Sequence, residues 1–272
     1  MERREIDSVI YEKDGPIARI ILNNPKRGNV QDQTMVWAFD KALSECEYDY
    51  DVKVLIIGAN GKGFCGGHLA SGDYPEFLEN RARTGTTWQG QTQLFLHPVL
   101  RLWEFPKPTI ARVHGYAVGG GSYWALLPDI TVASEDAWFQ MPHVHLMGLP
   151  GAETMIEPWL FMNYKRSMEY LYRKKKLTAA VALELGLVNE VVPRDQLEEK
   201  AEEIAREIAE APLTGLQATK ALVKRAWELM GMRLHQQWSN DMVSLVSRHQ
   251  DTLDHMYANM EKTKGKTDKG ST

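Results

Sequence analysis

The sequence predicts an α/β protein on two main observations. Over the first two thirds of the chain, short apolar runs typical of buried strands alternate with segments of helical periodicity. Beyond residue 178 the patterns are helical, with almost no strand signal. The 272 residues, 43% hydrophobic and 25% charged, fit one large globular domain with an appended region.

The first elements form a hairpin and then a strand–helix–strand unit. Residues 9–12 and 17–22 are apolar runs on either side of a turn at 14–16, which predicts the hairpin. Asp32 stands where the N-cap of a helix would stand, and apolar residues follow it at helical spacing as far as Cys46. The apolar run 52–57 then predicts a buried parallel strand.

A second unit of this kind follows, and then a helical region. Residues 109–113 and 130–133 read as strands, separated by a glycine-rich turn and a helix over 121–127. Further helices are predicted over 180–185, 196–209, 216–230 and 234–257. We therefore expect a core domain over residues 1–195, a helical region over 196–260 and a disordered tail over 261–272.

Composition excludes several classes of function. The net charge of −4 and pI near 6.1 argue against a nucleic-acid-binding groove, and apolar stretches fall well short of the roughly 18 residues of a membrane span. No cluster has metal-ligand spacing, so no metal is expected. Cys46 and Cys65 read as free thiols, and the charged N-terminus lacks the apolar stretch of a signal peptide, so a cytoplasmic location is expected.

Two glycine-rich turns are the strongest chemical signal. Residues 58–68 directly follow the strand 52–57, and residues 114–121 directly follow the strand 109–113. Backbone N–H groups at such turns can bind an anion, and two converging amides make an oxyanion hole for a carbonyl oxygen. A phosphate loop is an alternative that lacks the usual Gly-Lys-Ser/Thr sequence, and purely structural turns are another.

Several ordered motifs resemble those of the crotonase (enoyl-CoA hydratase/isomerase) superfamily. They occupy residues 63–69, 106–111 with 115–121, 150–151, and 177–180 with 182–192. The resemblance covers most of the chain, from about residue 8 to 225.

The resemblance implies a spiral of ββα units with a C-terminal helical trimerisation region, and a homotrimer or dimer of trimers. The implied substrate is an acyl-CoA thioester, with no prosthetic group. Its carbonyl oxygen would lie between the backbone amides of His68 and Gly120. CoA would bind near the loop at residues 25–30, where Lys26, Arg27 and Asn29 are the candidate contacts, although Arg27 also reads as an ordinary surface cation.

The catalytic positions depart from the hydratase pattern. Hydratases carry one glutamate three residues after the middle glycine and a second directly after a proline, where this chain has Tyr123 and His143. Without these carboxylates, water addition loses its usual acid and base, whereas the two amides can still stabilise an enolate. The sequence therefore favours C–C bond hydrolysis or decarboxylation. The alternatives are a hydratase or isomerase that uses His143 and a catalytically silent acyl-CoA-binding subunit.

Three side chains are the catalytic candidates. A histidine ordinarily titrates near neutral pH, so His143 is a candidate general acid or base. Glu153 can orient the imidazole or hold a water molecule, but it also reads as an acid in the first turn of a helix. Tyr123 can position a carboxylate, or it can be a packing residue of its short helix.

Overall fold

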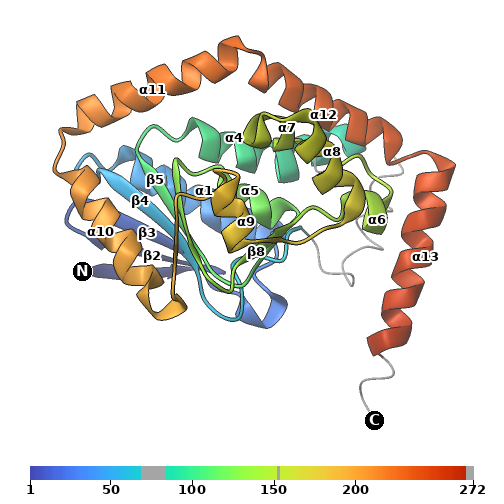
Figure 1. Cartoon of the computed structure of the whole chain (residues 1–272), viewed down its shortest axis with the longest axis horizontal. Coiled ribbons are helices and arrows are strands. Elements are labelled where there is room, and N and C mark those ends of the chain that lie inside the picture. Colours follow the sequence, from blue (N-terminus) through green and yellow to red (C-terminus); the bar gives the residue numbers. More distant parts are fainter. Residues whose placement is uncertain (69–83, 152–153, 268–272) are drawn as a thin grey trace.

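A twisted seven-stranded sheet is the centre of the molecule. The computed structural model describes residues 1–68, 84–151 and 154–267 (Figure 1). The strands, in their order across the sheet, are β1 (Glu2–Ile6), β2 (Val9–Asp14), β3 (Ile17–Leu22), β4 (Val54–Ala59), β5 (Thr109–Val113), β7 (Ile130–Ser134) and β10 (Glu190–Val192). The first three strands pair antiparallel, and from β3 onward each pair is parallel.

A small three-stranded sheet lies beside the larger one. It consists of β6 (Tyr116–Val118), β8 (Trp138–Gln140) and β9 (Leu177–Thr178). Strand β6 pairs parallel with β8, and β9 pairs antiparallel with β8. Because β6 follows β5 after a short turn and leads directly into a helix, this sheet holds the second glycine turn in place.

Side chains alternate between the two faces of the large sheet, as the period of a strand requires. On β3, Ala18, Ile20 and Leu22 belong to the main core, whereas Ile17 contacts the smaller cluster on the other face. The side chain of Arg19 lies on that second face and forms a bidentate ion pair with Glu202. Helix α10 (Leu197–Ala209) covers this face and places every fourth residue, from 197 to 209, on the sheet.

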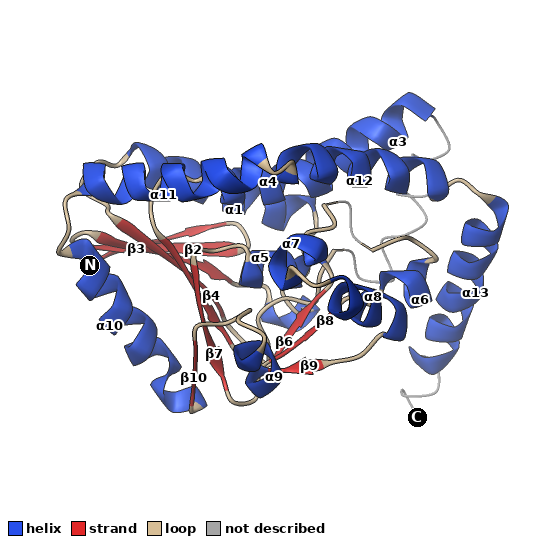
Figure 2. Ribbon diagram, turned by 45° about the horizontal axis from the view of Figure 1, so that its top comes forward, coloured by secondary structure: helices blue, strands red, loops and turns tan. Residues whose placement is uncertain are grey.

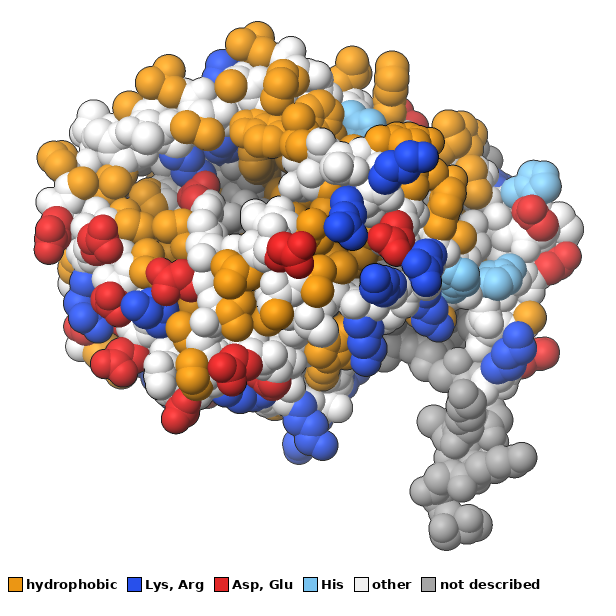
Figure 3. Space-filling model, in the orientation of Figure 1, with side chains coloured by type: hydrophobic (Ala, Val, Ile, Leu, Met, Phe, Trp, Pro, Cys, Tyr) orange, Lys and Arg blue, Asp and Glu red, His pale blue; other side chains and the backbone are white. Residues whose placement is uncertain are grey.

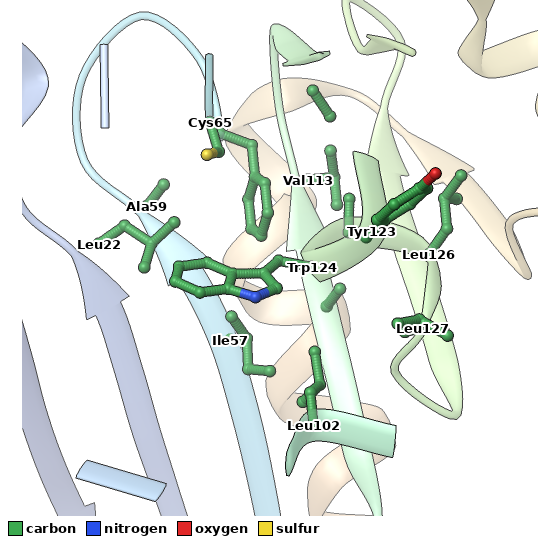
Figure 4. Close-up of a cluster of buried hydrophobic side chains, with 14 of the residues drawn as sticks. Leu22, Ile57, Ala59, Cys65, Leu102, Val113, Tyr123, Trp124, Leu126 and Leu127 are labelled. Atoms are coloured by element: carbon green, nitrogen blue, oxygen red, sulfur yellow. The ribbon is translucent and has the colours of Figure 1, made fainter. Parts of the chain in front are cut away.

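The other face is covered by the helices of the main core, which include α1 (Gln33–Tyr48), α4 (His97–Glu104) and α5 (Gly120–Leu126). Asp32 caps α1 as predicted, because its carboxylate accepts a hydrogen bond from Met35 N at 2.9 Å. Trp124 of α5 stacks on Phe39 of α1, with ring centroids 4.1 Å apart. Trp124 and Tyr123 leave α5 on opposite sides (Figure 4).

The remaining helices surround this core. They are η1 (Pro25–Arg27), α3 (Thr84–Gln91), η2 (Thr92–Leu96), α6 (His143–Met147), α7 (Glu157–Phe161), α8 (Tyr164–Arg173), α9 (Ala179–Glu184), η3 (Arg194–Gln196), α11 (Leu213–Leu229), α12 (Met232–Val246) and α13 (Gln250–Thr267). Helices α11 and α12 run along one side of the molecule, and α13 descends at its end (Figure 2). No helix of the described residues is both long enough and apolar enough to cross a membrane.

Helix α11 arches over a large hollow (Figure 3). The cavity beneath it has a volume of about 620 Å³ and is lined mainly by apolar side chains, among them Trp103, Trp159 and Trp227. Further large apolar side chains of α11 and α12 are exposed and do not line this cavity: Leu222, Leu229, Leu234, Trp238 and Leu245. The helical region therefore carries apolar surface both at this cavity and away from it.

The α/β class, the predicted hairpin and both strand–helix–strand units are confirmed, whereas the C-terminal segment differs from expectation. The helix expected over residues 234–257 is two helices, α12 and α13. Between them the Ser247 hydroxyl donates to the backbone oxygen of Ser244 at 3.1 Å, a local bond that competes with the helical ladder. Helix α13 continues to Thr267, so the first part of the segment expected to be disordered is helical.

Candidate active site

The two glycine turns meet at the ends of β4 and β5. Phe64 N and Cys65 N donate to Tyr116 O at 2.9 and 3.1 Å, and Val118 N donates to Cys65 O at 3.0 Å. A Cβ on Gly67 would lie 2.6 Å from Val118 O and 3.5 Å from the backbone nitrogen of Gly120. The turn that leads to His68 is therefore in backbone contact with the turn that leads to Gly120, and a side chain at residue 67 would separate them.

Helix α5 begins at Gly120, directly after a glycine with a positive φ angle. Gly119 has φ 56° and ψ −126°, a conformation that residues other than glycine rarely adopt. Because Gly120 is the first residue of the helix, its N–H has no acceptor within the helix and carries the positive end of the helix dipole. This amide is suited to bind a negatively charged oxygen.

His143 is the first residue of α6 and lies against the same turn. A Cβ on Gly119 would come within 2.9 Å of Cε1 of the His143 ring. The Nδ1 atom of His143 is buried and has no hydrogen-bond partner in the part of the chain that the structure describes. Burial lowers the pKa of this imidazole to about 4. At neutral pH the ring is therefore neutral and able to accept a proton.

Tyr123 has a partner that the sequence did not reveal. Its hydroxyl donates to the carboxylate of Glu157, with both oxygens at 3.2 Å. Glu157 is only 1% exposed, and burial raises its pKa to about 7. Tyr170 lines the same small cavity and is also buried. Tyr123 and Glu157 thus form a buried pair in which the carboxyl group gains and loses its proton near neutral pH.

Comparison with known proteins identifies the family. The model of the enoyl-CoA hydratase/isomerase family matches residues 12–268. The chain belongs to this family. It is 30% identical over 226 residues to the short-chain-enoyl-CoA hydratase of Clostridium acetobutylicum, a match that covers 82% of this chain and 84% of that protein. Its fold superposes on a crystal structure of an enoyl-CoA hydratase/isomerase from Xanthobacter autotrophicus Py2 with a TM-score of 0.84 and 30% identity, covering 94% of this chain and 97% of that one.

These matches confirm the crotonase-like fold and membership of the crotonase superfamily. The roles of His68, Gly120, His143 and Tyr123 in this enoyl-CoA hydratase/isomerase family member stay predictions.

The loop expected to hold CoA forms η1, the single turn at residues 25–27. Lys26 and Arg27 are exposed there, and Arg27 Nη1 donates to Asp32 at 3.2 Å. Asn29 is buried, and its amide nitrogen donates to backbone oxygens of residues 60, 63 and 64. The Asn29 side chain thus ties this loop to the first glycine turn, which gives it a shaping role in any CoA site.

Three further points concern the expected site. Glu153 lies outside the described residues. Among the residues that are described, no group of three or more His, Cys, Asp or Glu side chains is placed to hold a metal ion. The aromatic and Met-rich segment 138–162 lines part of a second apolar cavity, of about 660 Å³, between α6, α8 and α12.

Sequence reasoning missed Glu157 and Gln31. Glu157 directly precedes Pro158 at the start of α7, where an acid reads as an ordinary first-turn residue. Gln31 is 4% exposed, and its Nε2 donates to Gly120 O at 3.2 Å. No local pattern marks this glutamine, because its burial becomes visible only in the folded chain.

Proposed function

We propose that this protein acts on acyl-CoA thioesters by forming an enolate, with the backbone amides of His68 and Gly120 holding the thioester oxygen. His143 is the acid/base group. The observation that carries this proposal is the convergence of the two glycine turns, with the His143 imidazole against Gly119. An amide pair fixed in this way stabilises negative charge without further reorganisation.

The reaction we favour is cleavage of a carbon–carbon bond next to the thioester. In hydrolysis of a β-keto thioester, water adds to the keto carbon and the bond to Cα breaks, leaving its electron pair as the enolate. In decarboxylation, CO₂ leaves and the same enolate forms. In both reactions Cα then takes up one proton. His143, which is neutral because desolvation of its ring lowers its pKa, can take a proton from water and later return one to Cα.

Tyr123 and Glu157 support this preference over simple hydration. Tyr123 occupies the position of one hydratase glutamate, and its hydroxyl donates a hydrogen bond to the buried carboxylate of Glu157.

Lys26, Arg27 and the loop that Asn29 shapes are proposed to contact CoA. Hydration remains the second candidate because the relative in Clostridium acetobutylicum is named a hydratase.

The decisive experiment compares substrates in the wild-type protein and a His143→Asn variant. A short 2-enoyl-CoA is assayed by loss of its conjugated thioester absorbance, and β-keto and malonyl thioesters are assayed by mass spectrometry. We expect the wild-type protein to cleave the β-keto or malonyl thioesters and to hydrate the 2-enoyl-CoA slowly or not at all. The His143→Asn variant should lose the cleavage activity. Fast hydration that depends on His143 would instead establish a hydratase. Thioester binding without turnover of any substrate would indicate a silent acyl-CoA-binding subunit.

We also propose that copies of this chain assemble as a trimer or a dimer of trimers through the helical region at residues 196–260. The exposed apolar side chains of α11 and α12, with Leu229 81% exposed, support this proposal because surfaces of this kind are costly to leave in water. Analytical ultracentrifugation tests it, with Leu229→Glu expected to shift the assembly toward smaller species.

A further inference from the structure

The side chain of His68 lies at the glycine turn, although the proposed function uses only the backbone of this residue. A Cβ placed on Gly120 would come within 2.6 Å of His68 Nδ1 and still closer to Cε1 of the same ring. The imidazole also meets Phe95 edge to face, with centroids 4.4 Å apart. The ring therefore lies directly beside the residue whose amide is proposed to hold the thioester oxygen.

A second imidazole approaches the preceding residue of the same turn. Cε1 of His143 lies 2.9 Å from the position of a Cβ on Gly119. Two histidine rings thus reach consecutive glycines, next to the peptide bond that supplies the Gly120 N–H. The absence of side chains at both glycines leaves room for both rings.

Gln31 bridges the two glycine turns beside these rings. Its backbone N–H donates to Gly67 O at 2.8 Å, and its Nε2 donates to Gly120 O at 3.2 Å. A single buried residue therefore ties the two turns together. A Cβ on Gly120 would meet both Gln31 Oε1 and the edge of the His68 ring. Gln31 and His68 therefore both pack against the residue whose amide is proposed to hold the thioester oxygen.

We propose that the imidazole of His68 is a second acid/base group of this site and works together with His143. The inference rests on the proposed function. The last step of the proposed reaction, protonation of Cα, can also run in reverse, and α-proton exchange follows this reverse step: one ring accepts the proton from Cα, the C–H electron pair becomes the π bond of the enolate, and the thioester oxygen takes the negative charge. The other ring, in its protonated form, delivers a proton to carbon and becomes neutral. The pair then regains its starting state by exchange with water.

The test uses His68→Gln and His68→Ala, both of which keep the backbone N–H that the oxyanion hole needs. Exchange of the α-protons of butyryl-CoA is followed in heavy water by NMR, and butyryl-CoA binding is measured by calorimetry. Loss of an acid/base group lowers rates by about 10²–10⁴-fold. We expect a loss of this size with binding changed only a few-fold. Added imidazole should partly restore exchange in His68→Ala. His97→Ala, at the exposed start of α4, is the matched control.

Three results would overturn the inference, and they can be told apart. Exchange at the wild-type rate in both variants would leave His68 with a backbone role only. Loss of both exchange and binding, with no rescue by imidazole, would mean that the ring serves packing. Wild-type protein that binds butyryl-CoA but exchanges no α-proton would overturn the proposed function as well.

Discussion

Replacing Glu157 by Gln should change how the stability of this protein depends on pH. Glu157 is 1% exposed, and its carboxylate accepts hydrogen bonds from the hydroxyl of Tyr123 and from its own backbone N–H. Burial raises its pKa from an ordinary 4.5 to about 7. Burial of the protonated, neutral carboxyl group therefore costs less free energy than burial of the ionised carboxylate.

The direction and size of the effect follow from this difference in pKa. Between pH 4.5 and about 7 the folded protein keeps the Glu157 proton while the unfolded chain releases it. The unfolding free energy that this residue contributes is thus fully present below pH 4.5, falls as the pH rises, and levels off above about 7. One pKa unit corresponds to about 1.4 kcal/mol, so the total loss is about 3 kcal/mol. Glutamine is neutral at every pH, so the Glu157→Gln variant does not lose this unfolding free energy.

Urea unfolding of wild type and Glu157→Gln at pH 4.5 and pH 8.5, at equal protein concentration, measures this effect. We expect the variant to gain about 3 kcal/mol relative to wild type between the two pH values. Glu184→Gln, at an exposed site on α9, is the control and should show no such gain. If wild type and Glu157→Gln had parallel pH dependences, Glu157 would ionise as an ordinary surface glutamate, and the reasoning from burial would be refuted.

Three further predictions concern other parts of the molecule. Gly120→Ala should lower turnover of the acyl-CoA substrate by about 10²–10³-fold, because the added Cβ would collide with the His68 ring and displace an oxyanion donor; steady-state kinetics with circular dichroism to confirm folding would test this. Asp32→Ala should cost about 1 kcal/mol in urea unfolding through loss of the α1 N-cap, and Asp32→Asn should restore most of it. Cys46 and Cys65 are buried and the pKa of each thiol is raised to about 12 by burial, so neither should react with a thiol reagent at pH 8 until the protein is unfolded; rapid labelling of the native protein would contradict this.

Local sequence was sufficient for most of the elements. The strand Ile17–Leu22 was predictable because its apolar side chains face helices on both sides of the sheet, which leaves a run of apolar residues interrupted only by Arg19. The start of α1 was predictable because Asp32 caps it within three residues. The split between α12 and α13 was not, since both segments have helical periodicity and the break depends on how residues 247–249 turn the chain.

By itself, the sequence determined the fold class, the alternation of strands and helices in the repeated units and the two glycine-rich turns, because these follow from side-chain periodicity and from local runs of glycine. Tertiary structure decided which side chains meet at those turns. Tyr123 and Glu157 are 34 positions apart, and Gln31 and Gly120 are 89 apart. Contacts across such distances depend on how whole elements pack, and no local pattern encodes them. The partner of Tyr123, and the approach of the His68 and His143 rings to consecutive glycines, could therefore be seen only in the folded chain.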